Sequence, residues 1–229
     1  IAVDGNGNLF FTEDDSDSIL MKPADGGPLQ VVATENDIKA ATGESHADPK
    51  SLTVGNDGNV YVSDDSSDSI LRIDPATGDV TVLISEQVLD DLPGIHNVDL
   101  DGGIVTGLDG TIFAASDGDP DAIFAINPAT GEASVLASGT PFEDLDVYMM
   151  IAPNGDLIVA DDSGANTIYS IPTSGDNQGE VSVFLSPADI QAVTGQSSVD
   201  LEGGIGFDAT GNFFVAEENS DSVIKFTGF

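Results

Sequence analysis

The sequence predicts an all-β fold, a β-propeller of four-stranded blades, because a unit of about fifty residues recurs nearly five times. A turn glycine marks the copies at Gly7, Gly58, Gly110, Gly155 and Gly211, which places successive copies 45 to 56 residues apart. In the clearest copy, residues 51–83, three turns rich in Gly, Asp, Asn and Pro separate four apolar stretches. Four short strands per unit at an irregular period are typical of propeller blades with variable loops, so we count five blades.

The strands follow in the same order in every copy. Innermost strands are predicted at 1–3, 52–54, 104–106, 149–151 and 205–207; second strands at 9–12, 60–63, 112–115, 157–160 and 213–216; third strands at 19–22, 70–73, 123–126, 168–171 and 223–226; and fourth strands at 29–32, 80–83, 133–136 and 181–185. We therefore predict one domain, 1–229, with blades over 1–33, 51–84, 103–137, 148–185 and 204–229.

The fifth copy stops after its third strand. Its outer edge is then unpaired unless a segment before Ile1 or another chain completes it, which makes self-assembly through this blade one prediction. A six-bladed ring is the alternative if a blade has been lost from the N-terminal side. Because the chain starts at Ile1 inside a predicted strand, without an initiator Met, we expect a mature or trimmed product.

Alternating strand directions sort the turns onto two faces of the propeller. The Asn-Gly, Asp-Gly and Pro-Ala-Thr-Gly turns share one face, and the acidic turns between second and third strands share the other face with the connections between blades. Three connections have a Ser or Thr cap and a terminal Gly, which predicts short helices over 34–43, 85–94 and 186–195. Because these helices would deepen the mouth of the central channel, we predict the functional site on that face.

Two segments of the second copy resemble a known blade core. Gly58-Asn-Val-Tyr-Val-Ser-Asp64, followed by Ser69-Ile-Leu-Arg-Ile-Asp74, is similar to the blades of NHL-type and senescence-marker-protein/gluconolactonase-like propellers. The resemblance covers almost the whole chain and identifies a superfamily rather than an activity. It implies that the acid at the end of each second strand, replaced by Ser116 in the third copy, bonds to neighbouring turns.

The charge of the chain excludes some partners. With 41 acidic and 5 basic residues, the net charge of -36 repels phosphate backbones and anionic membranes, so we expect neither nucleic acid binding nor membrane insertion. Such a charge opposes compaction, and the fold should depend on salt or bound cations. An extracellular or cell-surface protein of a marine or salt-loving organism fits this composition, and Ca²⁺ is the expected counter-ion. The absence of cysteine leaves the redox compartment open.

Acids immediately before the innermost strands are the candidate metal ligands: Asp48, Asp101, Asp146 and Glu202. We expect them to converge on the channel mouth, where their mutual repulsion makes a hard cation favourable. Glu202-Gly-Gly204 is similar to the Glu-Gly-Pro of senescence-marker-protein-like propellers, which implies a ligand of the catalytic metal at Glu202, and at Asp101 and Asp146 by repeat position. That family also uses an asparagine, which has no equivalent here. In the alternative interpretation these acids accept hydrogen bonds from backbone amides.

A second set of acids occupies the turns at 13–17, 64–68, 117–121, 161–162 and 217–221. We interpret most of them as solvated Asx turns. Asp117, Asp119 and Asp121 alternate as in a calcium loop, but the following Gly and the distal Glu of an EF-hand are missing.

The two histidines, His46 and His96, both fall in connections between blades. Beside a metal-activated water either could act as a general base, and exposed loop histidines are the alternative. Neither a P-loop nor a Gly-x-Ser-x-Gly elbow is present, so the sequence gives no support to nucleotide use or serine hydrolysis.

Three functions follow as hypotheses. The first is a secreted, calcium-binding propeller that binds a protein, glycan or small molecule through its loop-rich face. The second is a metal-dependent hydrolase of the lactonase or esterase type with its ion at the channel mouth. The third is a structural component of a surface assembly.

Overall fold

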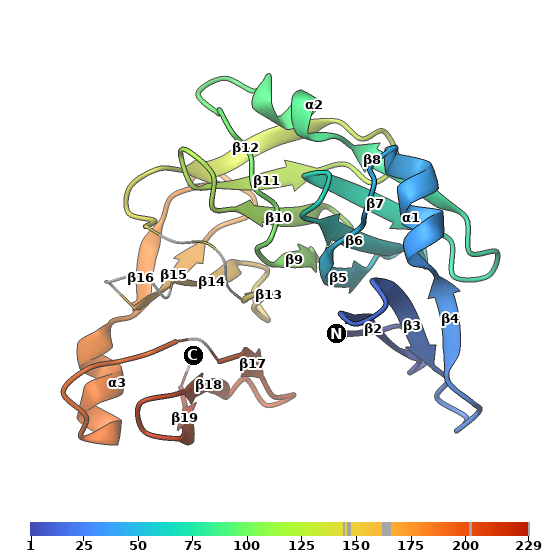
Figure 1. Ribbon diagram of the computed structural model, residues 1–229. Helices are drawn as coiled ribbons and strands as arrows, with labels where there is room; N and C mark the ends of the chain where they lie inside the picture. Colours follow the sequence, from blue (N-terminus) through green and yellow to red (C-terminus); the bar gives the residue numbers. More distant parts are fainter. Residues whose placement is uncertain (144, 146–147, 162–165, 202, 229) are drawn as a thin grey trace.

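The computed structural model describes the chain except for residues 144, 146–147, 162–165, 202 and 229. Within this part, strands β1 to β19 form five antiparallel sheets set around a common centre, as propeller blades are (Figure 1). Four sheets have four strands and the last, β17-β18-β19, has three. The predicted all-β propeller with five blades, an incomplete last blade and short helices between blades is confirmed.

The five blades have the following bounds. Blade 1 contains β1 (Ala2–Val3), β2 (Leu9–Glu13), β3 (Ser18–Lys22) and β4 (Gln30–Ala33); blade 2 contains β5 (Pro49–Val54), β6 (Val60–Asp64), β7 (Ser69–Ile73) and β8 (Val80–Ile84); blade 3 contains β9 (Ile104–Thr106), β10 (Ile112–Ser116), β11 (Ala122–Ile126) and β12 (Ala133–Ser138); blade 4 contains β13 (Met149–Ile151), β14 (Leu157–Asp161), β15 (Thr167–Ile171) and β16 (Ser182–Leu185); blade 5 contains β17 (Ile205–Phe207), β18 (Phe213–Glu217) and β19 (Ser222–Phe226).

Helices α1 (Glu35–Thr42) and α3 (Pro187–Thr194) have the predicted ends. Each begins with a capping box, made by Thr34 with Asp37 in α1, and each ends at a left-handed glycine, Gly43 in α1. Helix α2 (Glu86–Asp90) is shorter than predicted, and its Ser85 makes no side-chain cap. Pro93 explains the early end, because a proline disfavours helical geometry in the residue before it. None of the described helices has the length and apolar character needed to cross a membrane.

The core lies between blades rather than within them. Side chains alternate along each strand, so a blade has a forward face toward the next blade and a backward face toward the preceding one. Ile19 on the forward face of blade 1, for example, belongs to the same buried cluster as Leu71 on the backward face of blade 2. Equivalent clusters fill the next three interfaces, and their members repeat the same strand positions.

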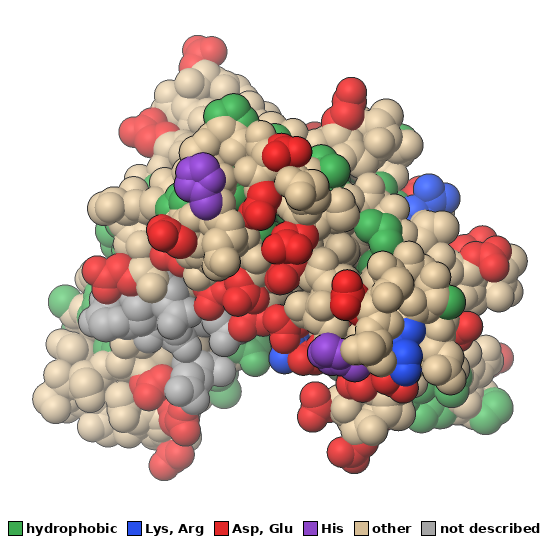
Figure 2. Space-filling view, turned by 45° about the horizontal axis from the view of Figure 1, so that its top comes forward, with side chains coloured by type: hydrophobic (Ala, Val, Ile, Leu, Met, Phe, Trp, Pro, Cys, Tyr) green, Lys and Arg blue, Asp and Glu red, His purple; other side chains and the backbone are tan. Residues whose placement is uncertain are grey.

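The ring has an opening between its first and last blades. Blade 1 and blade 5 face each other across this gap (Figure 1), and the space-filling view shows a notch between two lobes on the same side (Figure 2). On the face seen in Figure 2, acidic side chains gather around the hollow between the blades. The connections between blades lie on this face, and the candidate site lies among them.

Candidate metal centre

In blades 2 to 5, a buried polar side chain at the end of the second strand bonds to the connection that enters the same blade. It accepts a hydrogen bond from the backbone N–H of a connection acid in four blades: Asp64 from Asp48 at 2.8 Å, Ser116 from Asp99 at 3.0 Å, Asp161 from Glu143 at 3.1 Å and Glu217 from Asp200 at 3.0 Å. All four acceptor residues are buried. The bonding role that the family resemblance implies for this position is therefore present, and its target is the connection that carries the candidate ligands.

Asp64 provides a direct test of this contact. Its carboxylate also accepts from the hydroxyl of Ser67 at 2.6 Å, so Asp64→Ala leaves two partly buried donors without this acceptor and should lower the free energy of unfolding by about 1–3 kcal/mol. Asp64→Ser copies the residue found in blade 3 and should recover most of the loss. Urea unfolding of the three chains measures both effects. Equal stability of Asp64→Ala and the wild type would contradict the assigned role.

The connection into blade 3 is fixed by three successive backbone amides. Val98 N–H donates to Asp90 at 2.9 Å, Asp99 N–H to Ser116 and Leu100 N–H to Asp68 at 2.9 Å. The acceptors come from α2, from the end of β10 and from the β6–β7 turn of the preceding blade. The side chain of Leu100 is fully buried in the core between blades 2 and 3. Residues 98–100 thus form a rigid base for the carboxylates on either side of Leu100.

Five carboxylates meet at this base in two overlapping groups. Asp65, Asp68 and Asp99 form one group, and Asp99, Asp101 and Asp117 form the other; within each group, one oxygen from each residue lies within 4.8 Å of the others. Every member is partly buried. Asp99 belongs to both groups, so it lies at the centre of the negative charge.

The crowding of these acids changes their ionisation. Burial raises the pKa of Asp68 to about 6, and the neighbouring charges of Asp99, Glu86 and Asp65 add to the rise. The bond from Leu100 N–H opposes it. Burial also raises the pKa of Asp65. Asp65 and Asp68 are thus held near each other at an electrostatic cost, which a bound cation would remove.

Asp48 has a different partner from the one predicted. Its carboxylate pairs with Lys50 at 2.9 Å, and the same ammonium group reaches Asp65 at 3.3 Å. The hydrogen bond with Asp48 raises the pKa of Lys50. Lys50 therefore links the connection into blade 2 to the edge of the first carboxylate group, and Asp48 is not a member of either group.

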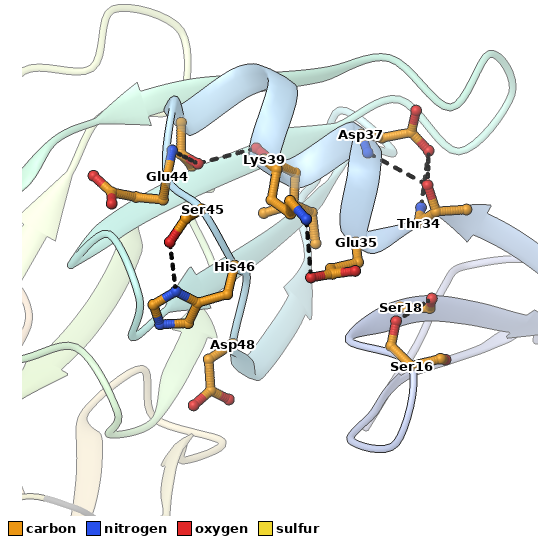
Figure 3. Close-up of polar contacts among 12 residues, drawn as sticks. Ser16, Ser18, Thr34, Glu35, Asp37, Lys39, Glu44, Ser45, His46 and Asp48 are labelled. Atoms are coloured by element: carbon orange, nitrogen blue, oxygen red, sulfur yellow. Dashed lines mark hydrogen bonds and ion pairs between the residues drawn. The ribbon is translucent and has the colours of Figure 1, made fainter.

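Of the other predicted residues, one joins a carboxylate group, two lie apart from both groups, and two fall outside the described residues. Asp101 is a member of the second group, whereas Asp146 and Glu202 are not among the described residues. His46 extends from the same connection as Asp48, with its Nδ1 3.3 Å from the hydroxyl of Ser45 (Figure 3). His96 forms a backbone bridge with Asp119. Both imidazoles are exposed, a band of acidic side chains separates them (Figure 2), and neither belongs to a carboxylate group within the described part of the chain.

Sequence reasoning missed Asp65, Asp68, Asp99 and Asp117 as candidate ligands. It treated the turn acids and the connection acids as two separate sets. The structure joins them because the acidic turn of one blade reaches the connection of the next. Asp68 accepts from Leu100 N–H, and Asn166 accepts from Leu201 N–H at 3.0 Å in the same way two blades later. The repeated position of a left-handed Asp or Asn in this turn is the signal that could have revealed the contact.

No protein-family model and no curated protein sequence matches the chain. Solved structures do resemble it. A catalytically inactive variant of virginiamycin B lyase from Staphylococcus aureus, solved with quinupristin, aligns with 98% of this chain and 64% of its own at 18% identity and a TM-score of 0.68. A gluconolactonase from Xanthomonas campestris aligns with 96% of this chain and 71% of its own at 12% identity and a TM-score of 0.63. A chain of a nidogen/laminin complex aligns with 98% of this chain and 73% of its own at 15% identity and a TM-score of 0.68.

The TM-scores show that these structures share a β-propeller fold with this chain. The chain spans less than two thirds of the length of the virginiamycin B lyase chain. The three proteins have different activities, so the fold alone does not select one of them.

Proposed function

We propose that this chain is a secreted, acidic propeller that binds calcium and presents the face carrying its connections to a binding partner. The observation that supports this function best is the meeting of four carboxylates with that of Asp99, on a base fixed by three side-chain contacts to backbone amides. Because these contacts fix the backbone of the connection, the ligands would need little reorganisation to bind an ion.

The chemistry of the five ligands favours calcium. All five are carboxylates. Ca²⁺ is a hard cation that takes about six to eight oxygen ligands in a flexible geometry. Soft metals are disfavoured because no thiol is present in the sequence and neither imidazole joins the described groups. Extracellular modules bind calcium at the weak end of the known range, which suits a site with exposed edges and supports an extracellular or cell-surface location.

A calcium ion at Asp99 would act as a bridge between blades. Asp65 and Asp68 belong to the turn of blade 2, whereas Asp99 and Asp101 belong to the connection into blade 3. Gly102 extends this contact to the next connection, since a Cβ there would lie 2.5 Å from the carbonyl oxygen of Leu145. Ion binding would therefore order the face that a partner would touch.

The second candidate is a metal-dependent hydrolase of the lactonase or esterase type. It is favoured by the structural likeness to a gluconolactonase and by the position of His96, three residues before Asp99 on the same connection. In that case His96 would move protons at a water held beside the ion.

Calorimetric titration of chelator-treated protein with CaCl₂ tests the proposal. Asp99→Asn removes the ligand shared by both groups and should weaken calcium binding at least about tenfold, or ~1.4 kcal/mol. Asp79→Asn makes the same change in charge in the exposed turn at the opposite face and is the matched control. Equal calcium affinity in the two variants would contradict the site. Lactone turnover that requires calcium and is lost in His96→Ala would favour the hydrolase over the binding module.

A further inference from the structure

The interface between blades 4 and 5 differs from the others in the side chains that fill it. In every blade, the third residue after the turn glycine pairs with a residue of the third strand, and both side chains lie on the forward face. Four blades have an aromatic ring at the first of these two positions, whereas blade 4 has Ile158. The pairs are Phe10 with Met21, Tyr61 with Arg72, Phe113 with Ala125, Ile158 with Ser170, and Phe214 with Lys225. Blade 4 therefore lacks the ring that the other blades carry on this face.

The turn before the second strand also differs in blade 4. In blade 2, a Cβ on Gly55 would lie 2.5 Å from Cε2 of Tyr61. In blade 3, a Cβ on Gly107 would lie 2.8 Å from Cε2 of Phe113, so in both blades a glycine lies directly against the ring. Blade 4 has Ala152 at this position. Because its methyl group is much smaller than a phenyl ring, Ala152 takes up only part of the space that the missing ring leaves.

A cavity of about 150 Å³ occupies that space, and Ala152, Ile158 and Ser170 line it. Phe184 of β16 and Phe207 of β17 add aromatic walls, with ring centroids 6.3 Å apart and planes at 67°. Its lining residues all belong to blade 4 or to β17. An apolar cavity of about this volume holds one benzene-sized molecule. The cavity thus has the size of the ring that blade 4 lacks.

Blade 2 shows how the polar end of such a ring could be held. The ring of Tyr61 is fully buried, and its hydroxyl group donates to the carboxylate of Asp57 in the turn at 2.9 Å. Asn154 has the same position in the turn of blade 4, directly before the glycine, and it lines the cavity. Its Oδ1 accepts from the N–H of Asp156 at 3.1 Å, and an amide oxygen can accept a second hydrogen bond. Asn154 can therefore serve as the acceptor for a hydroxyl group on a bound ring.

We propose that this cavity binds a small monocyclic phenol, with its ring against Ile158 and Phe207 and its hydroxyl group donating to Oδ1 of Asn154. A phenol is uncharged near neutral pH, because its pKa is about 10, so the net charge of -36 does not oppose its entry. The carboxylate groups lie between blades 2 and 3, whereas the cavity lies between blades 4 and 5. Phenol binding is therefore independent of the calcium site.

Methyl NMR of the full chain, labelled with ¹³C at isoleucine Cδ1, tests the proposal by titration with phenol to about 10 mM, since ligands of this size bind at roughly 1 mM. The signal of Ile158 should shift with saturation, and that of Ile70, in the interface between blades 2 and 3, should not. Ser170→Met copies Met21 of blade 1, fills the cavity and should abolish the saturable shift. Arg72→Met makes a change to the same residue at the same strand position of blade 2 and is the matched control.

Benzene, which lacks the hydroxyl group, tests the polar contact. Asn154→Ala should weaken phenol binding about fivefold and leave benzene binding unchanged, because only phenol loses a hydrogen bond. The comparison of Ile158 with Ile70 in the wild type needs no variant, so it decides the proposal even if Ser170→Met does not fold. A shift at Ile158 that is absent or not saturable overturns the site, as does equal phenol affinity in a folded Ser170→Met. Unchanged phenol affinity in Asn154→Ala overturns the choice of a phenol as the ligand.

Discussion

Removal of calcium at low ionic strength should lower the melting temperature of this protein by roughly 5–10 °C. A ligand present at about a hundred times its dissociation constant stabilises the folded state by ~2.7 kcal/mol, and in a chain of this size each kcal/mol corresponds to about 2–4 °C. The physical reason is specific to the site. Without a cation, Asp65, Asp68 and Asp99 repel one another in partly buried positions. Burial first, and then the charges of neighbouring acids, raises the pKa of Asp68.

The Asp99→Asn variant distinguishes stabilisation by calcium bound at this site from stabilisation by ionic screening of the whole chain. With chelator, it should melt at or above the temperature of the wild type, because one charge has been removed from both carboxylate groups. With calcium, it should melt below the wild type because the bridge between blades is lost. Differential scanning calorimetry at matched ionic strength, with NaCl in place of CaCl₂, measures the difference. A wild type whose transition does not change after exhaustive chelation would show that calcium has no structural role.

The second prediction compares the stability cost of shortening two side chains that occupy the same strand position, one buried and one exposed. Ile70 is fully buried between blades 2 and 3, so Ile70→Ala should lower the free energy of unfolding by about 2–5 kcal/mol through lost burial and the cavity left behind. Val223 has the same strand position in blade 5 but is 71% exposed, so Val223→Ala should cost less than about 0.5 kcal/mol in the monomer.

Urea unfolding at low salt, where copies repel each other, measures both variants as monomers. A cost for Val223→Ala that approaches the cost for Ile70→Ala would mean that blade 5 is covered within the chain. It would contradict the open ring.

The repeat could be predicted in detail because strand order and turn chemistry are local properties. Gly58 and its equivalents adopt positive φ, which fixes the turns, and short apolar runs such as Val60–Val62 in β6 mark the strands between them. The end of α2 was less clear, since the cap at Ser85 suggested a full helix and Pro93 ended it early. Local signals therefore gave the architecture and missed only a helix boundary.

The site was only partly predictable, because it depends on contacts between different copies of the repeat. Sequence position indicated Asp101, which joins a carboxylate group, and Asp48, which pairs with Lys50 and belongs to neither described group. Asp65 and Asp68 were assigned to a solvated turn. Their meeting with Asp99 depends on how far one blade is rotated relative to the next, and no single repeat encodes that rotation.

The position of the ion itself is the most direct test of the central claim, that carboxylates of successive blades meet around one cation. Anomalous diffraction from crystals grown in calcium, without chelator, would locate it. We expect a peak within coordination distance of Asp99, about 2.3–2.6 Å from its oxygen, with further ligands from Asp65 and Asp68 or from Asp101 and Asp117. Anomalous density confined to other acidic turns, with none at Asp99, would contradict the account.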